Sequence, residues 1–301
     1  MSATLPRGDS LTQPANYHQS WISRYLFLMA IATLSVMGIG SATRVMNAGL
    51  SCPDWPLCYG QLVPLTEMNL LVFLEWFHRV LASSMGLLTL GLVGASWRWR
   101  KELPGWLPWG AGFALILVLV QGALGGLTVT ELLRFDIVTA HLATGLLFFS
   151  CLVMMAVGLA PGLHVGLAWS TQNSWSGWIG LAACVAIYGQ SILGALVSSQ
   201  WAVHQCLAET APFCGVLQNH FIGVVPATVF SLIVGYLAWQ KKPALGIPIV
   251  LLLLVQIGLG ITTYRLQLQL PMITVCHQIV GACLLASMVT FTTLSFQLRR
   301  V

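Results

Sequence analysis

Charged residues are scarce in this 301-residue chain. Lys, Arg, Asp and Glu together make up 7% of the sequence and only eight residues are acidic, whereas 57% are hydrophobic. Such a composition, with a mean hydropathy of +0.84, provides too little polar surface to cover a water-soluble globule. Carboxylates are also rare within the apolar runs, which argues against a proton pump or relay. The composition predicts an all-α integral membrane protein.

Long apolar runs occupy most of the sequence. A membrane-spanning helix needs roughly 20 apolar residues, and the sequence contains eight windows of this kind. They lie near residues 22–43, 70–96, 106–128, 137–160, 177–199, 217–239, 246–264 and 272–295. An even number of spans places both termini on the same side of the bilayer.

The basic residues indicate which side this is. Most lie in the two tails and in the 97–103 and 240–243 loops, as Arg7, Arg24, Arg98, Arg100, Lys101, Lys241, Lys242, Arg299 and Arg300. Because positively charged loops stay in the cytoplasm, both termini are predicted to be cytoplasmic. The net charge of +5 is divided among these segments, so it indicates topology and no nucleic-acid binding. The absence of a long basic, serine-rich presequence favours a bacterial plasma membrane.

The second half of the chain resembles a diverged copy of the first. The segment Gln121-Gly-Ala-Leu-Gly-Gly-Leu-Thr128 precedes one intramembrane histidine, and Gln256-Ile-Gly-Leu-Gly-Ile-Thr-Thr263 precedes another by almost the same interval. Their glycines leave room for a flat macrocycle or for a neighbouring helix. Each half has four spans, which predicts two parallel four-helix repeats. The predicted division is an N-terminal half at 1–160, a linker at 161–176 and a C-terminal half at 177–301.

The eight cysteines fall into two groups. Four lie within apolar spans, where small buried hydrophobic residues are expected; they are Cys151, Cys184, Cys276 and Cys283. Cys52 and Cys58 share the first outer loop, and Cys206 and Cys214 share the third. Paired cysteines in short loops on the oxidising side predict two local disulfides. A metal site with His204 is the alternative for the second pair, but it leaves a tetrahedral site one ligand short.

Four histidines lie near the starts of the even-numbered spans; they are His78, His141, His220 and His277. These spans all run from outside to inside under the predicted topology, so the four imidazoles lie near the outer leaflet. A polar side chain at this depth is costly unless it is satisfied. Histidines on facing helices bind heme iron from both sides, which predicts the pairs His78 with His141 and His220 with His277. Each histidine taken singly could instead hydrogen-bond a neighbouring helix.

Glu75 is the carboxylate that does not lie in a loop, a tail or at a span edge. It precedes His78 by three residues and Arg79 by four, so the three side chains share one helical face. It is either a structural partner of Arg79 or a proton-transferring group beside a porphyrin edge. The outer-side arginines are candidate partners of heme propionates or interfacial anchors; they are Arg44, Arg79, Arg134 and Arg265.

Taken together, these residues resemble the heme A synthase family. The matching features are eight spans in two halves, Glu75-x-x-His78-Arg79, His141 within Thr139-Ala-His-Leu-Ala-Thr-Gly145, His220, His277 and a cysteine-paired first outer loop. The resemblance extends from about Trp21 to Arg300. It implies an oxidoreductase that converts the C8 methyl group of heme O into the formyl group of heme A.

The resemblance also implies roles for individual residues. His220 and His277 would be the axial ligands of a retained heme b, His78 and His141 would bracket the heme O substrate, and Glu75 would be the catalytic carboxylate. The outer-loop cysteine pair is linked in this family to heme delivery or stability. Heme O synthase and the assembly machinery of a terminal oxidase are the implied partners.

Two other classes of protein share some of these features. A diheme b-type membrane electron-transfer cytochrome would use four histidines equally well. Such proteins commonly stack their hemes across the bilayer, whereas all four histidines here are predicted on its outer side. A transporter with parallel repeats would require polar, broken helices at mid-membrane depth, and the sequence has few. The depth of the histidines therefore favours the synthase.

Overall fold

The computed structural model describes residues 17–160, 175–198 and 215–297. In these ranges the chain forms eight α-helices that are long and apolar enough to cross a membrane. They are α1 (Tyr17–Val45), α2 (Leu70–Arg98), α3 (Leu107–Thr130), α4 (Phe135–Leu159), α6 (Trp175–Val197), α8 (Gly215–Lys241), α9 (Pro243–Arg265) and α10 (Pro271–Gln297). The predicted all-α, eight-span fold is confirmed.

The largest difference from the predicted boundaries is at the start of α1, which begins five residues earlier than its apolar run. The added turn is polar and is held by contacts with other helices. Gln19 Nε2 donates to the carbonyl of Leu159 at 3.2 Å, and the ring of His18 stacks on Trp99 at 4.4 Å between ring centroids. Hydropathy does not detect such a turn, because tertiary contacts stabilise it.

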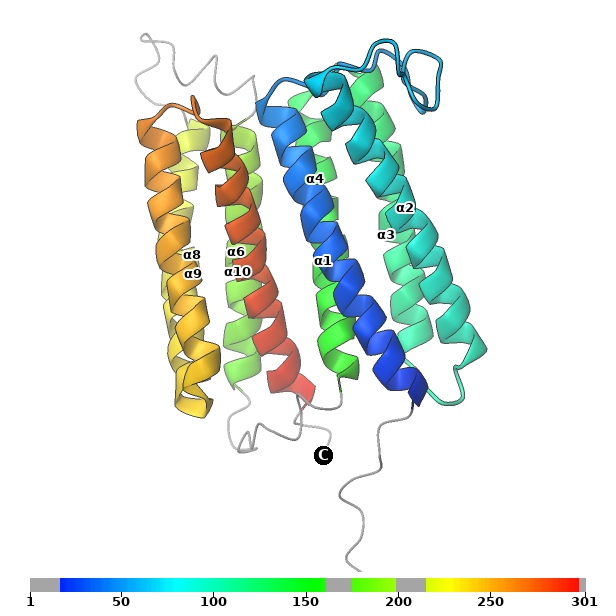
Figure 1. Cartoon of the computed structure of the whole chain (residues 1–301). Coiled ribbons are helices and arrows are strands. Elements are labelled where there is room, and N and C mark those ends of the chain that lie inside the picture. Colours follow the sequence, from blue (N-terminus) through cyan, green and yellow to red (C-terminus); the bar gives the residue numbers. More distant parts are fainter. Residues whose placement is uncertain (1–16, 161–174, 199–214, 298–301) are drawn as a thin grey trace, which may run out of the picture.

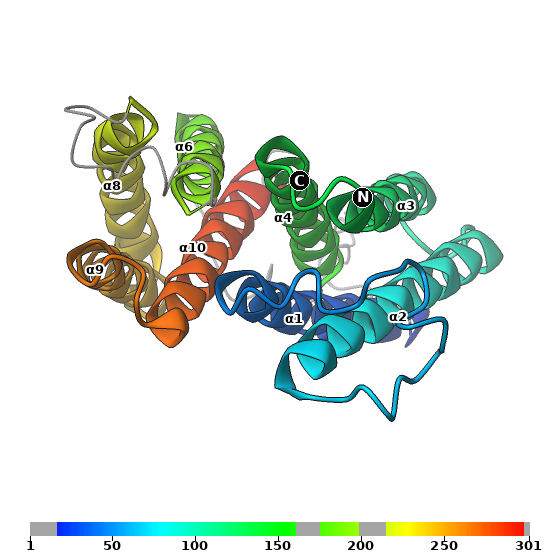
Figure 2. The same cartoon turned by 90° about the horizontal axis from the view of Figure 1, so that it is seen from above.

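The described helices fall into two groups of four (Figures 1 and 2). In one group α1, α2, α3 and α4 pack in a ring, and in the other α6, α8, α9 and α10 do the same. The groups meet where α10 packs against α1 and α4, and where α6 packs against α4. Residues of both groups can therefore contribute to one site near this boundary.

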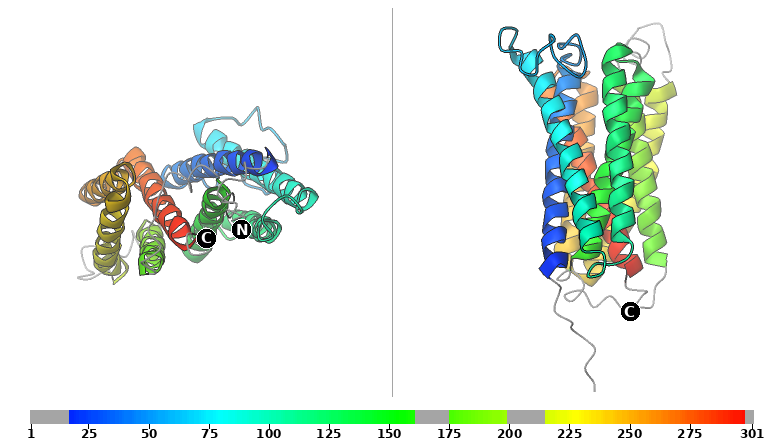
Figure 3. Two further views of the ribbon diagram at one scale, coloured as in Figure 1. Left: turned by 90° about the horizontal axis from the view of Figure 1, so that it is seen from below. Right: turned by 90° about the vertical axis from the view of Figure 1, so that its right-hand side faces the viewer.

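The helices alternate in direction. Helices α2, α4, α8 and α10 all begin on the face that carries the 46–69 loop, and α1 begins on the opposite face, where α10 ends (Figures 1 and 3). Arg98, Lys101 and Lys241 lie at that opposite face, at or just after the ends of α2 and α8. The 46–69 face is therefore the one near which all four histidines lie.

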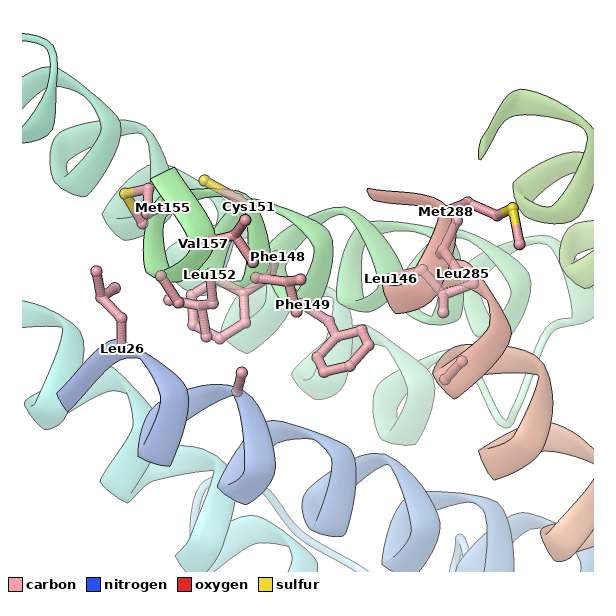
Figure 4. Packing of buried hydrophobic residues seen from close by; sticks show 14 of the residues in the cluster. Leu26, Leu146, Phe148, Phe149, Cys151, Leu152, Met155, Val157, Leu285 and Met288 are labelled. Atoms are coloured by element: carbon pink, nitrogen blue, oxygen red, sulfur yellow. The ribbon is translucent and has the colours of Figure 1, made fainter. Parts of the chain in front are cut away.

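Helix α4 is the most deeply buried of the described spans. Figure 4 shows Leu152 of α4 directed toward Leu26 of α1, while Leu146 of the same helix lies beside Leu285 of α10. Lipid tails are as apolar as these side chains, so close van der Waals packing rather than exclusion of water holds the helices together. Helix α4 is thus the wall shared by the two groups.

The loop before α2 is held by local bonds. The side chain of Asn69 caps α2 by accepting from the backbone N–H groups of Leu71 at 3.0 Å and Val72 at 3.1 Å. Cys52 and Cys58 form a disulfide, as predicted. The second predicted pair, Cys206 and Cys214, and the alternative metal ligand His204 lie outside the described residues.

Candidate functional site

A cavity of about 900 Å³ lies in the group formed by α6, α8, α9 and α10. His220 of α8 and His277 of α10 both line it, so the fold brings together the pair predicted for this half. Much of the remaining lining is apolar and includes Ile187, Leu253 and Leu284. This volume is in the range of pockets that enclose cofactors and other small molecules.

The N-terminal group also contributes to this cavity, through Leu142 and Leu146 of α4 and Arg44 of α1. Leu142 directly follows His141, which lies against a different helix. A Cβ atom added to Gly125 of α3 would be 3.5 Å from Cε1 of His141. Adjacent residues of α4 therefore contact two different sites, and α4 separates them.

Buried polar atoms without a hydrogen-bond partner gather at both histidine pairs. Among the described residues ten side chains carry such an atom, and six of these side chains line the cavity. The six are Arg44, Gln190, Gln256, Thr263, Thr274 and His277. Three others are His78, Gln121 and His141 in the N-terminal half. An unsatisfied buried polar group costs about 1–3 kcal/mol, so this clustering indicates ligands that bring polar atoms or a metal.

Arg44 and Arg265 both line the cavity. Arg44 lies in the last turn of α1 and Arg265 is the last residue of α9, and both helices end on the face of the 46–69 loop (Figure 1). Arg44 is partly buried and its Nε is enclosed, whereas Arg265 is exposed. A buried guanidinium group requires an anionic partner, and arginine matches the geometry of carboxylates. Two imidazoles, apolar walls and a basic end fit a heme, whose iron accepts histidine and whose propionates pair with arginine.

His78 and His141 form the second pair. The two imidazoles are close enough for a charge on one to act on the other, as are those of His220 and His277. His78 lies against α1, where a Cβ atom added to Gly40 would be only 2.7 Å from its Cε1. Neither His78 nor His141 lines the 900 Å³ cavity. The two pairs therefore define two sites, one in each group of helices.

Glu75 is buried, with 4% of its surface exposed, and is bound to the disulfide loop. Its Oε1 accepts from Arg79 Nη2 at 2.5 Å, and its Oε2 accepts the backbone N–H of Cys52 at 2.8 Å. Arg79 Nη1 in turn donates to the carbonyls of Asp54 and Leu57, both at 2.6 Å. The Glu75–Arg79 pair expected from the helical spacing is present, and the loop fixes it in place.

The four candidate arginines are therefore used differently. Arg44 and Arg265 line the cavity, whereas Arg79 is bound to Glu75 and to loop carbonyls. Arg134 is exposed and pairs with Asp136 at 2.7 Å and Glu131 at 3.3 Å. The hydrogen bond that Arg134 donates to Asp136 is the main reason that the pKa of Arg134 lies above its ordinary value.

Gln190 and Thr274 are among the polar residues of the cavity that the sequence did not single out. A signal for the first was available. Gln190 precedes Gly194 by four residues, which repeats the spacing of Gln121 to Gly125 in α3. Single threonines in an apolar helix carry no comparable signal, because they commonly bond the carbonyl four residues earlier.

Fold and site together define a helical membrane protein with two histidine pairs, one of which lines a cavity suited to heme. Residues 23–289 match the family model described as "Cytochrome oxidase assembly protein". The chain is 30% identical to the heme A synthase of Shewanella oneidensis, in an alignment that covers 90% of this chain and 94% of that protein. It is 25% identical to the heme A synthase of a Caulobacter species, over 93% and 96% of the two chains. The chain belongs to the heme A synthase family.

Proposed function

We propose that this chain oxidises the C8 methyl group of heme O to the formyl group of heme A. The observation that carries the proposal is the presence of two histidine pairs at one face, each with buried polar atoms that lack partners among the described residues. An electron-transfer protein needs hemes that stay bound, whereas this reaction needs one site for a resident heme and one for a heme that leaves. Two unlike sites suit the second requirement.

We assign heme b to the C-terminal site, with His220 and His277 as its axial ligands. The cavity around both histidines supports this assignment, as do Arg44 and Arg265 as partners for the propionates. A heme held there would supply electron transfer. Leu142, which lines this cavity directly after His141, marks a short route through α4 between the two sites.

We assign the heme O substrate to His78 and His141, with Glu75 as the catalytic carboxylate. Glu75 is buried three residues before His78 on the same helical face. Oxidation of a methyl group releases protons, and a buried carboxylate is suited to accept one. Arg79 and the N–H of Cys52 hold its two oxygens, so the disulfide loop is a positioning element for this group.

Two glycines should differ in their importance for the substrate site. Gly40→Ala is expected to lower heme A output by about tenfold to a hundredfold, because the added methyl group would lie 2.7 Å from Cε1 of His78 and must displace the ring. Gly125→Ala is the matched control, since its methyl group would lie at an ordinary 3.5 Å from Cε1 of His141. Quantifying heme A in membranes of both variants checks this. Equal output from the two would refute the proposed packing of His78.

Both termini are proposed to face the cytoplasm of a bacterial cell, with heme O synthase and the terminal oxidase assembly machinery as partners. The basic residues that follow α2 and α8, on the face opposite the 46–69 loop, support this orientation. A C-terminal fusion to alkaline phosphatase, which is active only outside the cytoplasm, should be inactive. An active fusion would reverse the topology.

The experiment that tests the function is mass-resolved heme analysis of the purified protein. The host should lack heme A, and expression is compared with and without a heme O synthase. Heme A, or a hydroxylated heme O, is expected only when heme O is supplied. Heme b alone under both conditions, near two per chain, would instead establish a diheme electron-transfer cytochrome.

A further inference from the structure

Three helices carry a glutamine followed four residues later by a glycine, and each of them packs against a helix that carries one of the histidines. In all three pairs the glutamine contacts that histidine. In α3 and α4, Gln121 Nε2 donates to the carbonyl of His141 at 2.9 Å. In α6 and α8, Gln190 Nε2 lies 2.9 Å from the carbonyl of His220 and 3.0 Å from its Nδ1. In α9 and α10, Gln256 Nε2 lies 3.5 Å from Nε2 of His277.

Glycines on both helices make this arrangement possible. Gly194 and Gly260 face the imidazoles, since an added Cβ atom would be 3.1 Å from Cε1 of His220 and 3.0 Å from Cε1 of His277. On the histidine helix, Gly223 and Gly281 face the glutamines, and a Cβ atom on either would meet the amide of Gln190 or Gln256. The histidine and the glutamine thus each fit into a gap on the other helix.

The amide oxygens of Gln121, Gln190 and Gln256 are buried and lack partners among the described residues. A histidine that binds iron through Nε2 carries a proton on Nδ1, and a partner that accepts this proton fixes the ring and makes it a stronger ligand. A half-turn of the Gln190 amide about its last torsion would bring Oε1 to 3.0 Å from Nδ1 of His220, and it would exchange the bond from Nε2 to the His220 carbonyl for one donated by Nδ1.

We propose that Gln190 is a positioning residue for His220, an axial histidine of the C-terminal site, and that Gln121 has this role for His141. Gln256 contacts Nε2 of His277, the nitrogen that would bind the iron, so the role is not extended to Gln256. The inference rests on the proposed function for the identity of the ligand. It extends that function by naming the groups that orient the ligands and tune the iron.

The fourth histidine differs. Gly40 of α1 faces His78 as the other glycines face their histidines, but the position four residues earlier is Val36, which has no hydrogen-bonding side chain. The residue four positions after His78 is Ala82, whereas the residue four positions after His141 is Gly145. His78 therefore has no glutamine of this kind, and it lies beside Glu75 in the proposed substrate site.

The test compares Gln190→Leu with Gln190→Glu in the full-length protein, expressed in a host that lacks heme O synthase so that only heme b is supplied. The midpoint potential of heme b should rise in the leucine variant, because the ligand becomes less basic. It should fall in the glutamate variant, because a carboxylate is a stronger acceptor. Gly223→Ala, which displaces the Gln190 amide without changing it, should shift the potential in the same direction as leucine.

Gln121→Leu is the matched control, because it removes the same amide from the N-terminal site and should leave the potential of heme b unchanged. An unchanged potential in Gln190→Leu, or a shift of the same sign in the leucine and glutamate variants, would overturn the proposal. These outcomes do not depend on heme A production. If the protein never makes heme A, and the leucine variant still raises the potential while the glutamate variant lowers it, the proposed function is wrong and the role of the glutamines stands.

Discussion

Glu75→Gln should reduce heme A output by about a hundredfold or more, because the substitution removes the only proton acceptor that we assign to the methyl oxidation. Heme O or a hydroxylated intermediate should accumulate instead. Heme b should stay bound, since Glu75 does not line the cavity around His220 and His277. Heme extraction followed by mass spectrometry, together with the absorption spectrum of the purified variant, measures both quantities.

The control for this variant is Glu131→Gln. Glu131 also pairs with an arginine, Arg134, at 3.3 Å, but this pair is exposed at the end of α3. Its loss should leave heme A output near that of the parent protein, because exposed ion pairs contribute little. Normal heme A output from Glu75→Gln would reduce Glu75 to the structural partner of Arg79 and of the Cys52 N–H.

His277→Ala and His220→Ala should each abolish the low-spin spectrum of heme b. An iron with imidazoles on both faces is low-spin, and the loss of one ligand leaves an open coordination position that changes the spin state. Absorption and electron paramagnetic resonance spectra of the purified variants test this. Heme A output should fall as well, because a heme b with an open coordination position would be a poorer electron-transfer partner for the substrate.

The matched substitution in the other half is His78→Ala. It should preserve the low-spin heme b spectrum and mainly lower the occupancy of the substrate site. A persistent low-spin spectrum in both His220→Ala and His277→Ala would mean that the resident heme lies in the N-terminal site and that the two halves are assigned in reverse.

The link between Glu75 and the disulfide gives the 46–69 loop a structural role near Glu75. The backbone N–H of Cys52 binds one oxygen of Glu75, and the carbonyls of Asp54 and Leu57 bind Arg79. The disulfide between Cys52 and Cys58 closes the same loop. A change in this loop is therefore transmitted to the carboxylate over a single hydrogen bond.

The sequence alone determined the spans and their order, and it named the candidate site residues. A helix in lipid must satisfy its own backbone groups over about 20 residues, so hydropathy locates it whatever its neighbours are. The pairing of Cys52 with Cys58 was also predictable, because only a short loop separates them. The joint pattern of Glu75, four histidines and the repeated halves was enough to indicate the family.

Only the tertiary structure decided which helix faces meet. In a membrane both the packed and the lipid-facing surfaces of a helix are apolar, so the sequence carries little periodic signal for its buried side. Arg44 of the first helix lines a cavity of the other half because α1 packs against α10. Gln190 reaches His220 because glycines on both helices leave room for the two side chains. Contacts of this kind depend on the crossing of helices distant in sequence, which hydropathy does not record.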